Sequence, residues 1–188
     1  MNIKTIFKTT FIVICLFAST LFYSACIKTI VNPPNPNDEE LITTLQINWI
    51  DSAGVQMPVS AIYKDIDGDG GNAPIQWDSI KLKANTTYFA TILLLDETKM
   101  PIDTISNQVL EEAQDHLFCF SPNDINATVI RTDKDQNNLE IGLQTKWITN
   151  AQSTGTMQIV LRHQPNIKNG SCALGASDLD ITFATFIQ

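Results

Sequence analysis

The sequence predicts an all-β fold, a single antiparallel β-sandwich with one short helix near residues 105–115. Three observations lead to this class. Apolar and polar residues alternate along most of the chain beyond residue 41, as they do in strands that bury one face. Turn residues separate these stretches, and one segment alone has apolar residues at helical spacing. The length suits one well-cored domain, which we place at residues 41–188 of the 188.

The alternating stretches define the predicted strands in chain order. The first, "ITTLQINWI", places Leu45, Ile47 and Trp49 on one face and polar residues on the other. "MPVSAIYK" follows, and then "TTYFATILLL", which is apolar on both faces, as is typical of a central strand. Later stretches with the same alternation are "NLEIGLQTKW", "MQIVLRH" and "DITFATFI".

The segment "DTISNQVLEEAQDHL" breaks the alternation. Ile105, Val109, Leu110, Ala113 and Leu117 recur at helical intervals, so we expect a short helix there. Many strands with a single helix favour a sandwich of two sheets.

The phrase "IKLKANTTYFATI" resembles the Leu-x-x-x-Thr-x-Tyr start of a central strand in fibronectin type III and related immunoglobulin-like modules. The resemblance implies an immunoglobulin-like sandwich in which the hydroxyl of Tyr88 pins a corner of the fold.

Residues 1–25 have the layout of a signal peptide, with lysines first, then the apolar run "FIVICLFASTLF", then small residues. "YSAC" resembles the lipobox of bacterial lipoproteins, in which the cysteine, here Cys26, receives acyl chains and becomes the new N-terminus. Tyr23 departs from that motif, which has a small aliphatic residue there. A plain secreted protein with an incidental cysteine is the alternative. Residues 26–40, rich in proline and asparagine, are expected to form an extended tether.

The charge balance excludes some partners. The predicted leader holds two of the twelve basic residues and none of the twenty acidic ones, so the mature chain carries a net charge of −10. Such an acidic chain without basic clusters is a poor candidate for binding nucleic acid. It is compatible with binding cations.

Two cysteines remain after the leader and the lipidated residue are set aside. Cys119 and Cys172 are predicted to form a disulfide, because an exported chain meets an oxidising compartment. A metal-binding thiol pair is the alternative.

The stretch "YKDIDGDGGNAP" contains a candidate calcium loop. Asp65, Asp67 and Asp69 alternate ahead of Asn72, and such oxygen ligands in a glycine-rich loop can wrap around a hard cation. It is not an EF-hand, because the twelfth position is Gln76 and the flanking segments read as strands. The alternative is a solvated turn that needs these residues for its backbone geometry.

A second stretch, "TDKDQNN", repeats the alternation with Asp133, Asp135 and Asn137. Lys134 reduces its negative charge and no glycine follows, so we interpret it as a turn joining two strands.

The two histidines suggest a possible copper or zinc carrier, with His116, His163 and a cysteine as ligands. Yet "HLFCF" reads as a strand, in which His116 points with Phe118 while Cys119 points the opposite way. His163 shares the inward parity of its strand. Structural, hydrogen-bonded histidines are therefore favoured over a metal site.

No catalytic motif stands out. The sequence has no serine in a G-x-S-x-G setting and no phosphate-binding glycine loop, so we expect no enzyme.

Several segments together look like a group of small outer-membrane lipoproteins of Bacteroidota: the cysteine with its tether, "DIDGDGG", "LKANTTYFATILLLDET", "EEAQDHLFCF" and "LRHQPNIKNGSC". The resemblance implies an outer-membrane location and an accessory role beside TonB-dependent receptors. "DSA", "DSI" and "DTI" also resemble the short O-glycosylation motif of these bacteria, which would modify Ser52, Ser79 and Thr104.

The resulting hypothesis is a non-enzymatic, membrane-anchored binding or accessory module with a calcium-stiffened loop. The alternatives are a structural or adhesive surface module and the copper or zinc carrier.

Overall fold

The computed structural model describes residues 41–68 and 71–188. The predicted signal peptide, the predicted lipidation site at Cys26 and the predicted tether lie outside the described residues, as does Asp69 of the predicted calcium loop.

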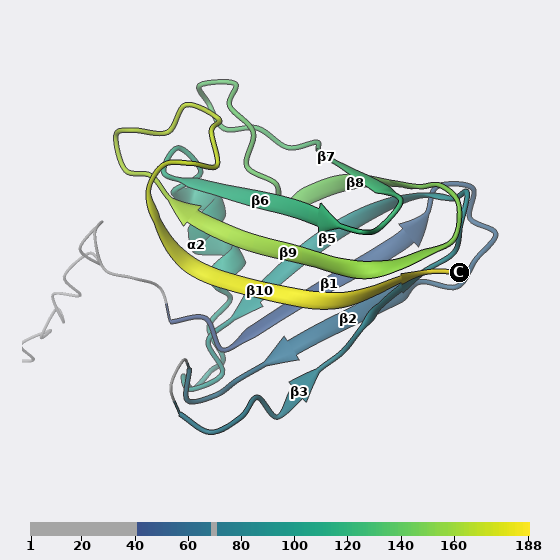
Figure 1. Ribbon diagram of the computed structural model, residues 1–188. Coiled ribbons are helices and arrows are strands. Elements are labelled where there is room, and N and C mark those ends of the chain that lie inside the picture. The colour runs from purple at the N-terminus through teal and green to yellow at the C-terminus, as the bar shows by residue number, and fades with distance from the viewer. Residues whose placement is uncertain (1–40, 69–70) are drawn as a thin grey trace, which may run out of the picture. The chain divides into compact units, whose positions relative to one another are not determined.

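The described strands form two facing sheets, and one helix lies at one end of them (Figure 1). The predicted all-β sandwich with one short helix is therefore confirmed.

The larger sheet has six strands in the order β3-β2-β1-β5-β8-β7, and all of its pairings are antiparallel. Its strands are β1 (Thr44–Asp51), β2 (Val59–Lys64), β3 (Gln76–Trp77), β5 (Thr87–Leu95), β7 (Ala127–Arg131) and β8 (Gln144–Thr149).

The smaller sheet has four strands in the order β4-β10-β9-β6. These are β4 (Ile80–Leu82), β6 (His116–Asn123), β9 (Ser153–His163) and β10 (Ala176–Ile187). Strand β10 pairs antiparallel with β9 but parallel with β4, so one pairing departs from the expected antiparallel pattern. The chain reaches β4 directly from β3 of the other sheet, so β4 joins the edge of the smaller sheet as a crossing segment.

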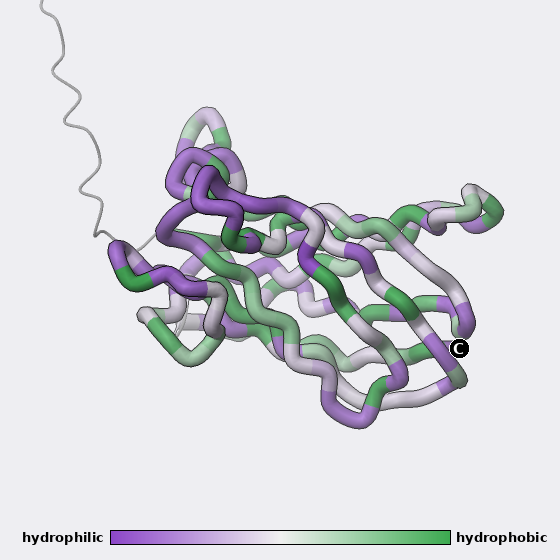
Figure 2. The backbone as a smooth tube through the Cα atoms, turned by 90° about the horizontal axis from the view of Figure 1, so that it is seen from above, coloured by the Kyte–Doolittle hydropathy of each residue, from purple (hydrophilic) through white to green (hydrophobic). Residues whose placement is uncertain are grey.

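The core lies between the sheets and consists of the inward positions of the strands. Figure 2 shows that hydrophobic and hydrophilic residues alternate along the strands. Trp49 on β1 and Trp147 on β8 are fully buried and meet edge to face, with ring centroids 5.3 Å apart. The smaller sheet contributes Phe118, Ile159 and Phe183 to the same cluster. The alternation in the sequence thus predicts which face of each strand is buried.

Strand β5 lies between β1 and β8, which confirms its predicted central position in a sheet. On the outer face of this strand, Phe89 remains half exposed, whereas Leu93 and Leu95 are partly buried.

Strand β8 begins later than the alternation predicts. The sequence pattern started it at Asn138, whereas the strand begins at Gln144. Gly142 has φ +98°, a backbone conformation that interrupts an extended strand. Ile141 and Leu143 are still buried, so their apolar side chains pack in the core from a loop.

The helix, α2 (Ile105–Glu111), is shorter than predicted. Ile105 and Val109 are its buried residues, while Leu110 is exposed. Leu117, predicted on the helical face, instead belongs to β6 and is buried there. Pairing of β6 with β9 requires an extended backbone from His116 onward, which ends the helical region before it.

Tyr88 pins a corner as its resemblance to immunoglobulin-like modules implied. Its side chain is buried at the start of β5, and its hydroxyl accepts a hydrogen bond of 3.0 Å from the backbone N–H of Lys83.

Candidate functional site

His116 and His163 face each other across neighbouring strands. His116 is the first residue of β6 and His163 is the last of β9, and the two are paired in register. Their rings stack with centroids 4.9 Å apart and an angle of 7° between their planes. Both side chains are buried on the inner face of the sheet, as their strand parity predicted.

Asp178 comes from the third strand of this corner, β10. The pairing of β10 with β9 shifts register between Ser177 and Leu179, so Asp178 is the extra residue of a β-bulge. Its side chain is almost fully buried. The bulge matters because regular alternation with Leu179 would direct Asp178 outward, whereas its carboxylate lies beside the two imidazoles.

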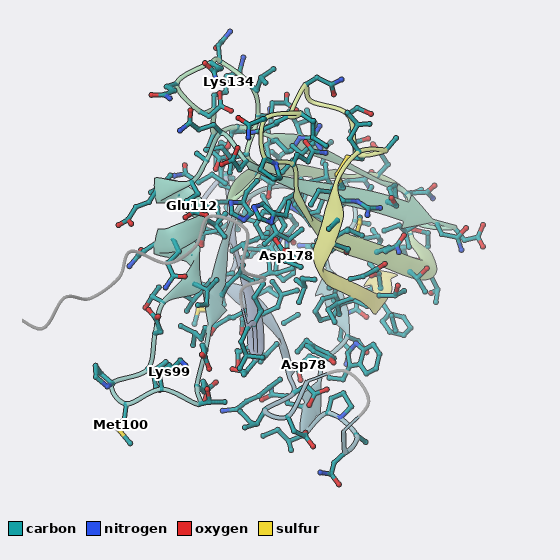
Figure 3. The ribbon with its side chains drawn as sticks, turned by 90° about the vertical axis from the view of Figure 1, so that its left-hand side faces the viewer. Asp78, Lys99, Met100, Glu112, Lys134 and Asp178 are labelled. Atoms are coloured by element: carbon teal, nitrogen blue, oxygen red, sulfur yellow. A yellow bond between two sulfur atoms is a disulfide. The ribbon has the colours of Figure 1, made fainter. Side chains whose placement is uncertain are left out.

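The ligand atoms of the three side chains lie within 4.8 Å of one another, and Figure 3 shows Asp178 near the centre of its view. His116 Nε2 is 3.5 Å from Asp178 Oδ2, and His163 Nδ1 is 4.0 Å from Asp178 Oδ1. These separations suit ion pairing but are too long for good hydrogen bonds.

Several polar atoms here are buried without hydrogen bonds. In the part of the chain that is described, both carboxylate oxygens of Asp178 and Nε2 of His163 have no hydrogen-bond partner. A buried polar atom left this way costs about 1–3 kcal/mol, and more when it is charged. The corner therefore has unused capacity to bind a ligand.

The second nitrogen of His116 fixes its orientation. Nδ1 lies 3.1 Å from the carbonyl oxygen of Glu112, and because a carbonyl can only accept, Nδ1 carries the proton. Burial alone lowers the pKa of His116, but the Asp178 carboxylate and the Glu112 carbonyl outweigh it and hold this pKa above its ordinary value. Nε2 is thus the atom turned toward Asp178.

A pocket of about 260 Å³ opens beside Asp178. Three carboxylate residues line it, Asp65, Asp178 and Asp180, together with Tyr63. Its apolar lining includes Leu41, Ile42, Leu179 and Ile181.

The predicted disulfide between Cys119 and Cys172 is present. Cys119 packs with Leu117 and Val160 in a small cluster separate from the main core, on the face of β6 opposite His116. Neither thiol is therefore free to ligate a metal, and the cysteine proposed as a third ligand beside the histidines is wrong. The third ionisable side chain that lies beside the two histidines is Asp178.

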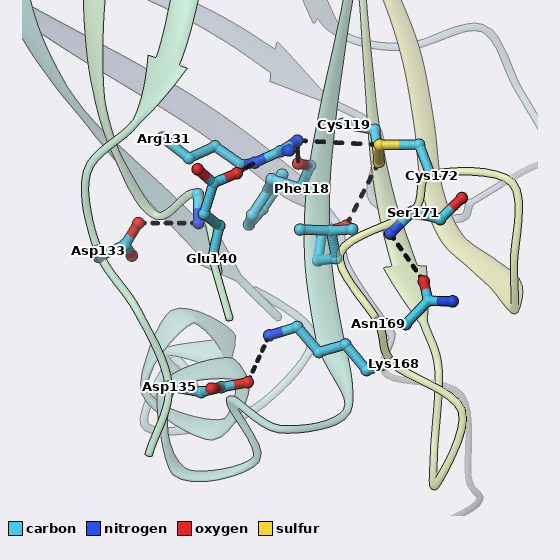
Figure 4. A network of polar contacts seen from close by, with 12 residues as sticks. Phe118, Cys119, Arg131, Asp133, Asp135, Glu140, Lys168, Asn169, Ser171 and Cys172 are labelled. Carbon is cyan, nitrogen blue, oxygen red and sulfur yellow. Dashed lines mark hydrogen bonds and ion pairs between the residues drawn. A yellow bond between two sulfur atoms is a disulfide. The ribbon is translucent and has the colours of Figure 1, made fainter. Parts of the chain in front are cut away.

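The disulfide belongs to a loop, residues 164–175, that connects β9 to β10 and is held by polar contacts (Figure 4). Lys168 Nζ donates to Asp135 Oδ2 at 2.9 Å and to the Ala113 carbonyl at 2.7 Å. Arg131 Nη1 donates to the Phe118 carbonyl at 2.9 Å and also lies 3.8 Å from Cys172 Sγ of the loop. Because this loop joins the strand carrying His163 to the bulge carrying Asp178, these contacts support the site from outside.

Of the described calcium-loop residues, Asp65 lines the pocket, whereas Asp67 and Asn72 are not among its lining residues. Asp65 is buried, with Oδ2 accepting a hydrogen bond of 3.2 Å from the Tyr63 hydroxyl and Oδ1 without a hydrogen bond among the described residues. Asp67 Oδ2 accepts from the backbone N–H and the side-chain amide of Asn72. Those bonds hold the pKa of Asp67 below its usual value. Calcium binding stays a prediction.

The second aspartate stretch is a turn, as interpreted from the sequence. Asp135 Oδ1 accepts from the backbone N–H groups of Asn137 and Leu139, and Asp133 Oδ1 accepts from that of Gly142. These three hydrogen bonds stabilise the turn, while the second oxygen of Asp135 accepts from Lys168 of the loop at residues 164–175.

The three predicted glycosylation residues lie outside the strands' inner faces. Ser52 is exposed, while Ser79 and Thr104 are partly buried. The aspartate before each serves the backbone or a neighbour: Asp51 accepts from Ala53, Asp78 from Ile62, and Asp103 from the side chain of Gln108. Glycosylation stays a prediction.

Comparison with models of protein families, with curated proteins and with solved structures found no significant match for this chain. Within residues 41–68 and 71–188, no helix is both long and apolar enough to span a membrane.

Proposed function

We propose that this chain is a non-enzymatic outer-membrane lipoprotein, anchored through Cys26, whose sandwich domain is a binding module for a cationic ligand and an accessory to a TonB-dependent receptor. The observation that carries the binding role is the acidic pocket lined by Asp65, Asp178 and Asp180. The net charge of the mature chain, −10, favours the same class of ligand.

Two features support a binding role over catalysis. The sulfur atoms of Cys119 and Cys172 are bonded to each other, so neither is a thiolate nucleophile. The Glu112 carbonyl orients His116 toward Asp178. The imidazole therefore lies beside a buried carboxylate and is not turned toward a nucleophile for which it could act as a base.

The anchor is tested by labelling growing cells with palmitate. The wild-type chain is expected to take up label and, when globomycin blocks the lipoprotein signal peptidase, to accumulate as an uncleaved precursor that still carries label, because the sulfur is acylated before cleavage. Cys26→Ser, which removes the acylated sulfur, should lose the label altogether. Cleavage that is insensitive to globomycin, or persistence of label in Cys26→Ser, would contradict lipidation.

The accessory role is tested by purifying the tagged lipoprotein from solubilised outer membranes. Recovery of a TonB-dependent receptor in constant ratio to the lipoprotein supports the role. A lipoprotein that is recovered without a stable partner favours a structural or adhesive surface module instead.

The calcium loop is tested separately by calorimetry on chelator-treated protein. If Asp65 and Asp67 bind calcium, millimolar calcium produces heat and raises the melting temperature, and Asp67→Asn removes both effects. Absence of both effects in the wild type rejects the calcium loop and leaves a turn capped by Asp67.

A further inference from the structure

We propose that His116, His163 and Asp178 form a binding site for one divalent transition-metal ion of the zinc and copper(II) class. The proposal names the ligand of the acidic binding module proposed above, but it does not depend on lipidation or on the receptor. It rests on the convergence of three donor atoms that strands β6, β9 and β10 bring to one corner.

The donor atoms are close enough to share one ion. One ring nitrogen of each histidine and a carboxylate oxygen of Asp178 all lie within 4.8 Å of one another. Bonds of about 2.0–2.1 Å at tetrahedral angles would set ligand atoms about 3.4 Å apart. The distances from His116 Nε2 to Asp178 Oδ2, 3.5 Å, and from His163 Nδ1 to Asp178 Oδ1, 4.0 Å, are close to this value. Because the two imidazole rings are stacked nearly parallel, at least one ring must rotate to direct its nitrogen at a shared ion.

The site is built rather than incidental. The histidines are fixed by strand pairing, and Asp178 is turned inward by a β-bulge, a feature often found where a strand must redirect one side chain. The Glu112 carbonyl accepts the Nδ1 proton of His116 and leaves Nε2 for a ligand, which is the usual outer contact of a metal-binding histidine.

The oxygens of Asp178, which lie at ion-pairing distance from the histidines but accept no hydrogen bond among the described residues, are the independent sign of a missing ligand. Its side chain is about 1% exposed, and neither oxygen accepts a hydrogen bond from any residue in the described ranges. A bound cation would satisfy this buried carboxylate and the imidazole nitrogens together. Asp178 also lines the acidic pocket, so a cation that enters the pocket meets this residue.

The donor types select the metal. Two imidazoles and one carboxylate suit zinc and copper(II), whereas calcium and magnesium prefer sets composed of oxygen. Copper(I) favours sulfur ligands, and the sulfur atoms of Cys119 and Cys172 are engaged in the disulfide.

The test is a zinc titration of the lipoprotein purified in detergent and stripped with chelator. The wild-type chain is expected to bind one zinc ion per chain, and millimolar calcium should not compete. Asp178→Asn, which keeps the shape of the side chain but removes its charge, should weaken zinc binding by at least about 100-fold, since even outer-shell changes cost about 10- to 100-fold.

Asp180→Asn is the matched control. Asp180 lies two residues away, lines the same pocket and is exposed, with Oδ1 accepting from Gln158. This variant should keep wild-type zinc affinity. Equal losses in both variants would indicate general attraction to an acidic pocket and would overturn the site, as would unchanged binding in Asp178→Asn.

X-ray absorption spectroscopy of the zinc-loaded wild-type chain tests the ligands without any variant. Two imidazole ligands, oxygen and no sulfur in the zinc shell are expected. Sulfur in the shell, or failure of the stripped wild type to bind zinc, overturns the proposal, whereas an unlipidated chain that binds zinc would reject only the anchor.

Discussion

Two glycines of the loop at residues 164–175 show how one residue position can be constrained by its neighbours. Gly170 and Gly175 both have left-handed backbones, with φ +87° and +80°. A Cβ on Gly170 would meet nothing within 4 Å, whereas one on Gly175 would collide with the carbonyl oxygen of His163. Gly175 therefore allows the chain to pass directly against the strand end that carries a site residue.

Changing each glycine to alanine separates backbone strain from collision. Gly170→Ala should cost about 1–2 kcal/mol of unfolding free energy, the usual cost of a left-handed non-glycine residue. Gly175→Ala should cost clearly more, because His163 or the loop must also move. Urea denaturation of both variants measures the difference, and equal losses would contradict the close approach.

Tyr88 allows a second prediction from a single hydrogen bond. Tyr88→Phe leaves the Lys83 backbone N–H without its acceptor and should lower the unfolding free energy by about 1–3 kcal/mol. Lys83→Ala keeps that N–H and changes only an exposed side chain, so it should stay within about 0.5 kcal/mol of the wild type. Urea denaturation with unchanged slope tests both, and a wild-type midpoint for Tyr88→Phe would argue against the corner role.

The candidate site was only partly predictable from the sequence. Strand parity placed His116 and His163 inward, because alternation reports which face of a strand is buried. The same rule would place Asp178 outward, because Leu179 and Ile181 point inward. A one-residue bulge has no composition signal here, so the third member of the cluster emerged only from the register of β10 with β9.

At the scale of elements, the loop at residues 164–175 is held to the turn before β8 by a buried ion pair. The side chains of Lys168 and Asp135 are both almost fully buried. Burial raises the pKa of Asp135, but Lys168 and the backbone N–H groups of Leu139 and Asn137 outweigh it and hold that pKa below its usual value. The ionised pair therefore contributes stability at neutral pH.

Lys168→Met should cost about 3–5 kcal/mol at pH 7, because it leaves the Asp135 carboxylate buried without its cation. The cost should shrink in acid. Since the folded-state pKa of Asp135 is lowered, the wild type has this stability above the unfolded value of about 4 and loses it as the pH falls through the folded value. In the variant the Asp135 carboxylate has lost its cation and takes up a proton more readily, so the variant gains stability as the pH falls toward that unfolded value.

Urea denaturation at several pH values between 7 and 3 measures the two curves. Lys134→Met is the control, because Lys134 is exposed at the tip of the same turn and should change stability little at any pH. A difference between Lys168→Met and the wild type that is constant with pH would contradict the role of Asp135.

Elements differed in how well the sequence predicted them. Strands such as β5 and β9 were predicted because they are long enough for several repeats of alternation. Strands β3 and β4 have two and three residues, too few for a period to appear. The helix was predicted too long because Leu117 fits both a helical and an alternating pattern, and only the pairing of β6 with β9 decides between them.

For the molecule as a whole, the sequence predicted two layers but not their composition. The assignment of each strand to a sheet depends on pairing between residues far apart in the chain, such as the pairing of β4 with β10. The disulfide acts at this scale too, because it joins residues separated by 53 positions. In the chain-entropy model the disulfide lowers the conformational entropy of the unfolded chain, so it stabilises the whole domain and not only the residues around the bridge.

Reducing the disulfide should therefore lower the stability of the whole domain. The loop that it closes corresponds to about 4 kcal/mol in the chain-entropy model. Such a loss is a large share of the roughly 5–15 kcal/mol typical of a domain, so the reduced wild type should unfold at a much lower urea concentration than the oxidised one.

Fluorescence of the buried Trp49 and Trp147 reports the transition. Both forms contain the same side chains, which excludes packing changes as the cause, and a Cys119→Ala/Cys172→Ala variant should be insensitive to reductant. Coincident transitions of oxidised and reduced wild type would mean that the unfolded chain is already confined in this region without the bridge.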